Sequence, residues 1–152
     1  MCWETNRGFF RGFVYATRGV LRCVKEERNF RFHLTFAAYV VGFATQFSLS
    51  RVEWLVLCLC IGAMLSAELI NSAIERTVDR ISTEQHPLSG AAKDVAAASV
   101  LILAVAVTVI GVLLFWRPTE WADLITRWVH DIWQPCVLAV SFLPAFFFVF
   151  RR

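Results

Sequence analysis

The sequence predicts an all-α integral membrane protein: a helical bundle with an N-terminal amphipathic surface helix, three core transmembrane helices, a C-terminal amphipathic helix and a short fourth span. Three observations support this fold class. Of the 152 residues, 58% are hydrophobic, and 14 of them are Phe. The mean hydropathy of +0.59 is above that of ordinary soluble domains. Long apolar stretches recur along the chain, and Lys and Arg gather in alternate segments between them.

The N-terminal half contains the surface helix and the first spans. Over residues 8–26 the apolar residues recur at helical spacing, and most of the basic residues lie on other faces of the helix. This pattern predicts a helix lying on the membrane surface. A soluble helix packed on a partner is the alternative. A spanning helix needs roughly 20 apolar residues. Leu34–Leu49 reaches that length with its flanks, Trp54–Leu65 continues to Asn71, and Val95–Trp116 has it without one charge.

The C-terminal part contains two further elements. Between residues 119 and 133 the apolar residues, three Trp among them, fall on one helical face, which predicts an interfacial helix on the outer leaflet. Cys136–Phe150 has only fifteen residues and includes Pro144. We therefore expect this stretch to form the short fourth span.

The distribution of Lys and Arg predicts the orientation. Residues 1–33 carry seven of these residues, 76–94 carry three and the C-terminus carries two, so four spans place twelve of fifteen on one side. The positive-inside rule puts that side, with the N-terminus, in the cytoplasm. Anionic headgroups account for the net charge of +3, and no nucleic-acid partner is expected. The five scattered cysteines show no CxxC spacing and are expected to be small apolar fillers.

The stretch AELINSAIERTVDR, residues 67–80, places polar side chains on a helix that begins in apolar sequence. At about 100° per residue, five of them share a stripe about 100° wide. These are Glu68, Asn71, Ser72, Glu75 and Asp79. An ionisable residue inside a membrane helix is costly and indicates function by default. Three acids in register, running from the membrane towards the cytoplasm, predict a cation site and a proton acceptor.

Depth along the helix suggests separate roles for the acids. Glu68 is the most embedded, and loss of water there disfavours its charged form, which suits a general base that works near neutral pH. Glu75 lies two turns nearer the cytoplasm and is expected to meet a hard cation, with Glu27 as a second ligand. Phosphoryl transfer needs bound metal, a base and cationic clamps. The basic residues available as clamps are Lys93, Arg11 and Arg18. No GxxxxGK[ST] motif is present, which excludes a P-loop enzyme.

The run from Glu68 to Leu101, with the pattern E-x-x-N-x-x-x-E-x-x-x-D followed by AKD, closely resembles the small bacterial membrane kinases of the prokaryotic diacylglycerol kinase and undecaprenol kinase family. EERNFRFH, Glu26 to His33, resembles a second block of that family, especially in the undecaprenol kinases. The resemblance covers about residues 8–116. It implies a homotrimer of three-span subunits, with sites between subunits at the cytoplasmic surface of the bacterial inner membrane.

The same resemblance implies roles for residues that match the family's motifs. Glu68 matches the catalytic base, and Glu27 and Glu75 match the magnesium-binding glutamates beside the nucleotide. The residues that match the ATP-binding positions are Tyr15, Glu84, Gln85, His86, Lys93 and Asp94. Arg7 or Arg11 stands near the place of an N-terminal arginine of the family. Asn71, Ser72 and Asp79 form a supporting polar cluster.

The resulting prediction is a lipid kinase that depends on ATP and Mg²⁺ and phosphorylates undecaprenol or diacylglycerol, giving undecaprenyl phosphate or phosphatidic acid. Residues 1–117 are expected to form the kinase domain. Residues 118–152 depart from the three-span pattern and are expected to form an extension with an anchoring or partner role. Two alternatives remain: a small transporter that uses one membrane glutamate, against which Lys93 and Asp94 argue, and an inactive scaffold of the same fold.

Overall fold

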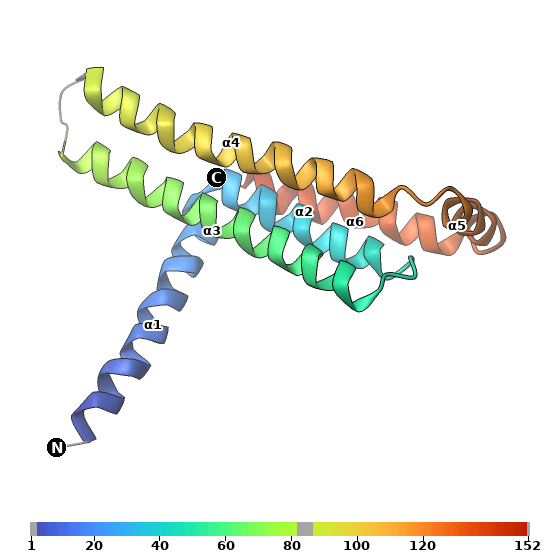
Figure 1. Cartoon of the computed structure of the whole chain (residues 1–152), viewed down its shortest axis with the longest axis horizontal. Helices are drawn as coiled ribbons and strands as arrows, with labels where there is room; N and C mark the ends of the chain where they lie inside the picture. Colours follow the sequence, from blue (N-terminus) through green and yellow to red (C-terminus); the bar gives the residue numbers. More distant parts are fainter. Residues whose placement is uncertain (1–2, 82–86, 152) are drawn as a thin grey trace.

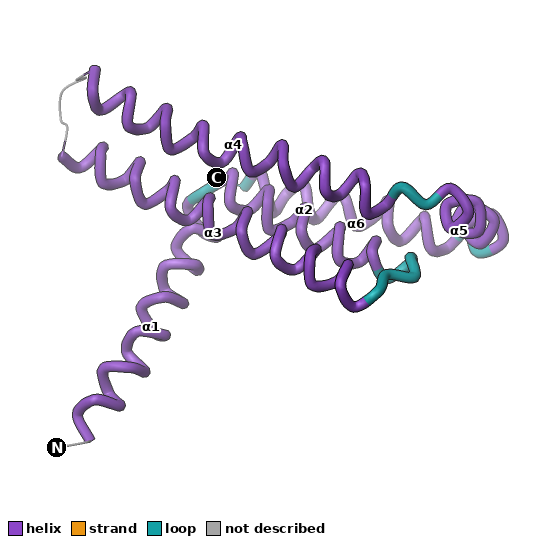
Figure 2. The backbone as a smooth tube through the Cα atoms, viewed as in Figure 1, coloured by secondary structure: helices purple, strands orange, loops and turns teal. Residues whose placement is uncertain are grey.

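The computed structural model describes residues 3–81 and 87–151. Within these ranges the chain is helical, without strands, and short turns join the helices (Figure 2). The helices are α1 (Trp3–Glu26), α2 (Arg28–Ala44), α3 (Arg51–Ile81), α4 (Pro87–Phe115), α5 (Pro118–His130) and α6 (Trp133–Phe150). The predicted all-α class is thus confirmed.

α2, α3, α4 and α6 run alongside one another (Figure 1). α4 packs on α3, α3 packs on α2, and α6 packs on the other side of α2. α1 leaves this bundle at a steep angle, and α5 lies across the end remote from α1 (Figure 1). Consecutive helices of the bundle run in opposite directions, so the start of α2, the end of α3, the start of α4 and the end of α6 face the same way. This is the arrangement that four antiparallel spans produce.

Three of the described helices are long and apolar enough to cross a membrane: Arg51–Ile81, Leu88–Phe115 and Trp133–Phe150. The third corresponds to the short fourth span expected at Cys136–Phe150, and it begins three residues earlier. Pro144 lies inside this helix without ending it. Proline is tolerated in membrane helices because neighbouring groups satisfy the carbonyl that it leaves without a donor.

α2 differs from the expected stretch Leu34–Leu49. The helix begins at Arg28, ends at Ala44 and has 17 residues, about 25 Å at 1.5 Å per residue, which is less than the roughly 30 Å of a hydrocarbon core. The chain turns after Ala44 because the Phe47 ring packs between Phe115 and Trp121, at centroid distances of 5.3 and 5.4 Å. Aromatic packing at this end, which only the fold creates, therefore takes the last residues of the apolar run out of the helix.

The end of the bundle beside α5 is joined by charged side chains. Ser50 and Glu53 form a reciprocal cap at the start of α3, with N···O distances of 2.7 and 3.3 Å. Arg117 pairs with Glu53 and with Glu120. The backbone N–H of Ser48 donates to Glu120 at 2.7 Å. These contacts tie the turn between α2 and α3 to the turn between α4 and α5.

Candidate functional site

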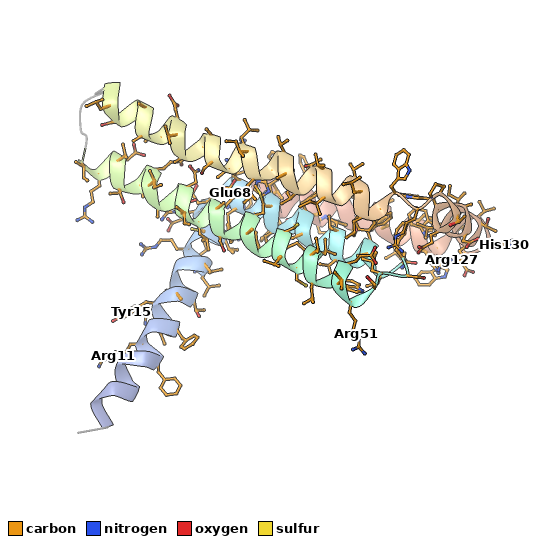
Figure 3. All side chains as sticks on the ribbon, viewed as in Figure 1. Arg11, Tyr15, Arg51, Glu68, Arg127 and His130 are labelled. Carbon is orange, nitrogen blue, oxygen red and sulfur yellow. The ribbon has the colours of Figure 1, made fainter. Side chains whose placement is uncertain are left out.

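The polar stripe of α3 becomes progressively more exposed along the helix. Glu68, Asn71 and Ser72 are buried, with exposed fractions of 4%, 7% and 4%. Glu75 is half-buried and Asp79 is exposed. Glu68 lies within the bundle, well inside the length of α3 (Figure 3). A buried acid in a bundle of otherwise apolar helices needs a partner, and the structure provides one from α2.

The partner of Glu68 is His33. The His33 Nε2 atom lies 3.2 Å from Glu68 Oε1, and this contact is an ion pair when the imidazole is protonated. His33 belongs to the EERNFRFH block, but sequence reasoning assigned it no role. The two residues are 35 positions apart and meet only because α2 packs on α3. An imidazole at this distance can orient the carboxylate.

Asn71 links the buried part of the stripe to Glu75. Its side-chain amide donates to Glu75 Oε1 at 2.9 Å, one turn further along the helix. Its carbonyl oxygen, Oδ1, is buried and has no hydrogen-bond partner among the described residues. A buried acceptor without a partner is unfavourable by about 1–3 kcal/mol. Such an atom marks a place where an ion or a water molecule is expected to bind.

Glu27 is held at the junction of α1 and α2, where it is the N-cap residue of α2. Arg76 of α3 donates to Glu27 Oε1 from Nε and Nη2, at 3.2 and 2.7 Å. Its third nitrogen lies 2.8 Å from Glu26. Sequence reasoning missed Arg76, because its position after Glu75 does not reveal that it reaches a hinge 49 residues away. The contact places Glu27 next to the polar stripe.

The predicted magnesium ligands are not gathered into a complete site within this one chain. The described residues contain no group of three or more His, Cys, Asp or Glu side chains arranged to hold a metal ion. Even so, the chemistry of the donors suits a hard cation. Glu27 and Glu75 supply carboxylate oxygens, and the Asn71 carbonyl oxygen is buried without a partner.

The predicted nucleotide-binding residues lie in two separate places. Lys93 of α4 forms an ion pair with Asp79 of α3, and Asp94 beside it is exposed. Arg11 and Tyr15 lie on the projecting part of α1, away from Glu68 of the same chain (Figure 3). The predicted positions Glu84, Gln85 and His86 lie outside the described residues.

Cys23 forms part of the contact between α1 and α3. It lies on the last turn of α1, is 8% exposed, and has the Ser72 side chain nearby. Burial raises the pKa of this thiol, although the nearby Arg76 acts in the opposite direction. The other described cysteines, at positions 58, 60 and 136, are also free, and none is fully buried.

Together, the fold and this site define a small helical membrane protein with acid, imidazole, amide and basic groups along one helix at one end of a bundle. The family described as prokaryotic diacylglycerol kinase matches residues 14–115. The chain therefore belongs to the prokaryotic diacylglycerol kinase family, and its class is that of a lipid kinase. α5 and α6 lie beyond the matched residues.

Individual relatives agree with this assignment. The chain is 47% identical over 112 residues to the undecaprenol kinase of Bacillus subtilis (strain 168), which covers 74% of this chain and 90% of the relative. It is 34% identical over 103 residues to the diacylglycerol kinase of Haemophilus influenzae, covering 66% and 87%. The diacylglycerol kinase of Escherichia coli (strain K12) is 31% identical over 102 residues, covering 67% and 84%.

Proposed function

We propose that this lipid kinase transfers the γ-phosphate of ATP to the hydroxyl of undecaprenol, with diacylglycerol as the second candidate acceptor. The observation that carries the proposal is Glu68, a carboxylate buried inside an apolar bundle, 3.2 Å from an imidazole and on the same helix face as Glu75. The 47% identity to an undecaprenol kinase favours the first acceptor. The products are undecaprenyl phosphate or phosphatidic acid.

In the proposed reaction Glu68 acts as the general base. Its carboxylate accepts the proton of the lipid hydroxyl, and the freed oxygen electron pair attacks the γ-phosphorus. The bond from the γ-phosphorus to the bridging oxygen breaks, and its electron pair leaves on the β-phosphate of ADP. His33 orients the Glu68 carboxylate. Lys93 and an arginine of α1, Arg11 or Arg7, offset the charge of the phosphates.

Mg²⁺ fits the oxygen donors near the Glu68 stripe. Glu27 and Glu75 would hold it, and the unpartnered Asn71 carbonyl oxygen lies in the same polar cluster. When bound, the ion would neutralise part of the charge on the phosphates of ATP. Arg76, which already contacts Glu27, keeps that carboxylate in place at the hinge.

We further propose that the enzyme is a homotrimer with sites between subunits. One observation supports this. Arg11 and Tyr15 project away from Glu68 of their own chain (Figure 3), so they could lie beside a Glu68 only in another subunit. The proposed setting is the bacterial inner membrane, with the N-terminus and the ATP site in the cytoplasm.

The decisive experiment is transfer of labelled phosphate from ATP, with Mg²⁺, in mixed micelles that contain either undecaprenol or diacylglycerol. Label in undecaprenol that is lost in Glu68→Gln supports the proposed reaction. Asp123→Asn, which alters an exposed acid on α5, is the matched control and should retain turnover. Label in diacylglycerol alone would show that undecaprenol is the wrong acceptor and that diacylglycerol is the substrate. No label in any lipid alcohol would favour the transporter or scaffold alternative.

A further inference from the structure

Arg31 joins the ends of two helices that are far apart in the sequence. It is 4% exposed. Its Nε and Nη2 atoms donate to the carbonyl oxygens of Val149 and Arg151, at 3.1 and 2.9 Å. Its Nη1 atom donates to the carbonyls of Lys25 and Val24, at 3.0 and 3.4 Å. The last carbonyls of a helix have no partner within it, and a cation near them is favourable. One guanidinium thus caps both α1 and α6.

These contacts lie next to the candidate site. Lys25 directly precedes Glu26 and Glu27, whose carboxylates hold Arg76 of α3. His33, two residues after Arg31, contacts Glu68. A movement of Arg31 would therefore shift both Glu27 and His33, because only a few residues separate each of them from Arg31 or from the carbonyls that it holds. The residues that Arg31 holds at the other end are Val149 of α6 and its C-cap residue Arg151, both outside the residues matched by the family.

Packing along α2 and α6 aims the end of α6 at Arg31. The Tyr39 and Ser141 hydroxyls are 2.9 Å apart. The Tyr39 and Phe142 rings stack at 4.9 Å with an interplanar angle of 11°. Two turns further towards the site end, Arg31 meets the last turn of α6. This register continues at the helix end, where Arg28 lies over the Phe150 ring at 5.9 Å.

We infer that α6 is an intramolecular clamp on the hinge between α1 and α2, and that Arg31 is the positioning residue through which it acts. By holding the last carbonyls of α1 against α6, Arg31 keeps Glu27 beside α3. It touches none of the proposed reacting groups. The consequence for magnesium rests on the proposed function, whereas the clamp itself rests only on the contacts of Arg31.

Cys23 allows the clamp to be measured without activity. The thiol is buried on the last turn of α1, so release of the hinge exposes it. In the full-length protein in detergent, maleimide labelling of Cys23 is followed by peptide mass spectrometry, which separates it from the other cysteines. Arg31→Gln should label severalfold faster than wild type. Asn29→Ala is the matched control, because Asn29 lies in the same turn of α2 but is exposed, and it should label at the wild-type rate.

The role of α6 is tested by Ser141→Leu, which removes the Tyr39 hydrogen bond and adds volume between α2 and α6. It should also speed Cys23 labelling, and combining it with Arg31→Gln should add little, since both act on one contact. Ser141→Ala, which creates no excess volume, is its control. If Arg31→Gln does not fold, Ser141→Leu carries the test. Unchanged Cys23 labelling in the folded variants would overturn the clamp.

The Mg²⁺ concentration for half-maximal activity separates the clamp from the proposed function. It should rise severalfold in Arg31→Gln and stay unchanged in Asn29→Ala. Arg31→Lys, which keeps the charge but not the fork of donors, should lie between wild type and Arg31→Gln. Faster labelling with an unchanged Mg²⁺ requirement would uphold the clamp and count against Glu27 as a metal ligand.

Discussion

At the scale of single residues, burial differs between the α3 acids in the way that their proposed roles require. Glu68 is almost fully enclosed and contacts one imidazole, whereas Glu75 is half-buried and receives an amide hydrogen from Asn71. A base has to be shielded from water and oriented, while a metal ligand has to reach an ion at the surface. The gradient of exposure along one helix face therefore matches the order in which a lipid hydroxyl and a nucleotide would approach.

The substitution Glu68→Gln tests the first of these roles. The amide has nearly the same shape as the carboxylate but cannot accept the hydroxyl proton, so turnover should fall by roughly 10²- to 10⁴-fold, the range that general base catalysis contributes. ATP binding should remain close to wild type, because the proposed nucleotide-binding residues lie elsewhere. Phosphate transfer and equilibrium nucleotide binding measure the two effects. Retention of most turnover would exclude Glu68 as the base.

At the scale of helices, side-chain pairs join neighbouring elements at both ends of the bundle. At the site end, Lys93 pairs with Asp79 and connects α4 to α3. At the other end, Arg117 connects the starts of α3 and α5 through Glu53 and Glu120. Pairs at or near the surface contribute little to stability on their own. Their effect is to fix which turn of one helix lies opposite which turn of the next.

The Lys93 pair distinguishes a phosphate ligand from a structural contact. If Lys93 binds ATP phosphates, Lys93→Met should lower kcat/KM for ATP by roughly 10- to 100-fold, because a hydrogen bond to a charged group contributes about 1.5–3 kcal/mol. Asp79→Asn removes the same ion pair but leaves the ammonium group, so its loss should be much smaller. Steady-state kinetics with varied ATP measure both. Equal losses in the two variants would reduce Lys93 to a link between helices.

The contribution of the Glu120 contacts, at the end of the bundle beside α5, to the stability of the fold should depend on pH. The Ser48 N–H and Arg117 lower the pKa of Glu120 below its ordinary value of 4.5. A carboxylate with a lowered pKa stabilises the fold above that ordinary value, and the contribution is lost as the pH falls through the folded-state pKa. Glu120→Gln should therefore lower Tm at pH 7, and the difference from wild type should shrink below pH 4.5. Thermal unfolding followed by circular dichroism, with Asp123→Asn as control, measures this. A pH-independent difference would contradict it.

At the scale of the whole molecule, the single chain leaves much apolar surface open. α4 packs mainly on α3, and Phe115 at its end also packs on Phe43 of α2. Its outward side chains are highly exposed, with Ile102 at 71% and Leu113 at 72%. In a bilayer such a surface faces lipid or the helices of another subunit. The separation of Arg11 and Tyr15 from Glu68 favours contact with another subunit for part of this apolar surface.

The proposed homotrimer has a direct test. Native mass spectrometry from mild detergent should give a species of three times the 17.3 kDa chain mass. Association should be retained in Glu68→Gln, since Glu68 is buried inside its own chain and contributes to chemistry in this proposal. A purely monomeric protein that still transfers phosphate would contradict the proposal that sites lie between subunits.

Much of the architecture could be predicted from local patterns. Hydropathy and helical spacing placed α1, α3, α4 and α5, and they marked Cys136–Phe150 as a short span. The motif E-x-x-N-x-x-x-E-x-x-x-D set Glu68, Asn71 and Glu75 on one helix face, because a helix fixes the relative directions of residues three and four apart. The end of α2 at Ala44 could not be predicted, since it depends on rings that α4 and α5 supply.

The sequence by itself determined the class of protein, the polar stripe of α3 and the membership of a kinase family, because these depend on composition and on spacing within single elements. Only the tertiary structure decided which distant groups meet. His33 reaches Glu68, Arg76 reaches Glu27, and Arg31 caps both α1 and α6. Each of these contacts joins different helices, and its physical cause is the packing of one helix against another, which leaves no periodic signal in either segment.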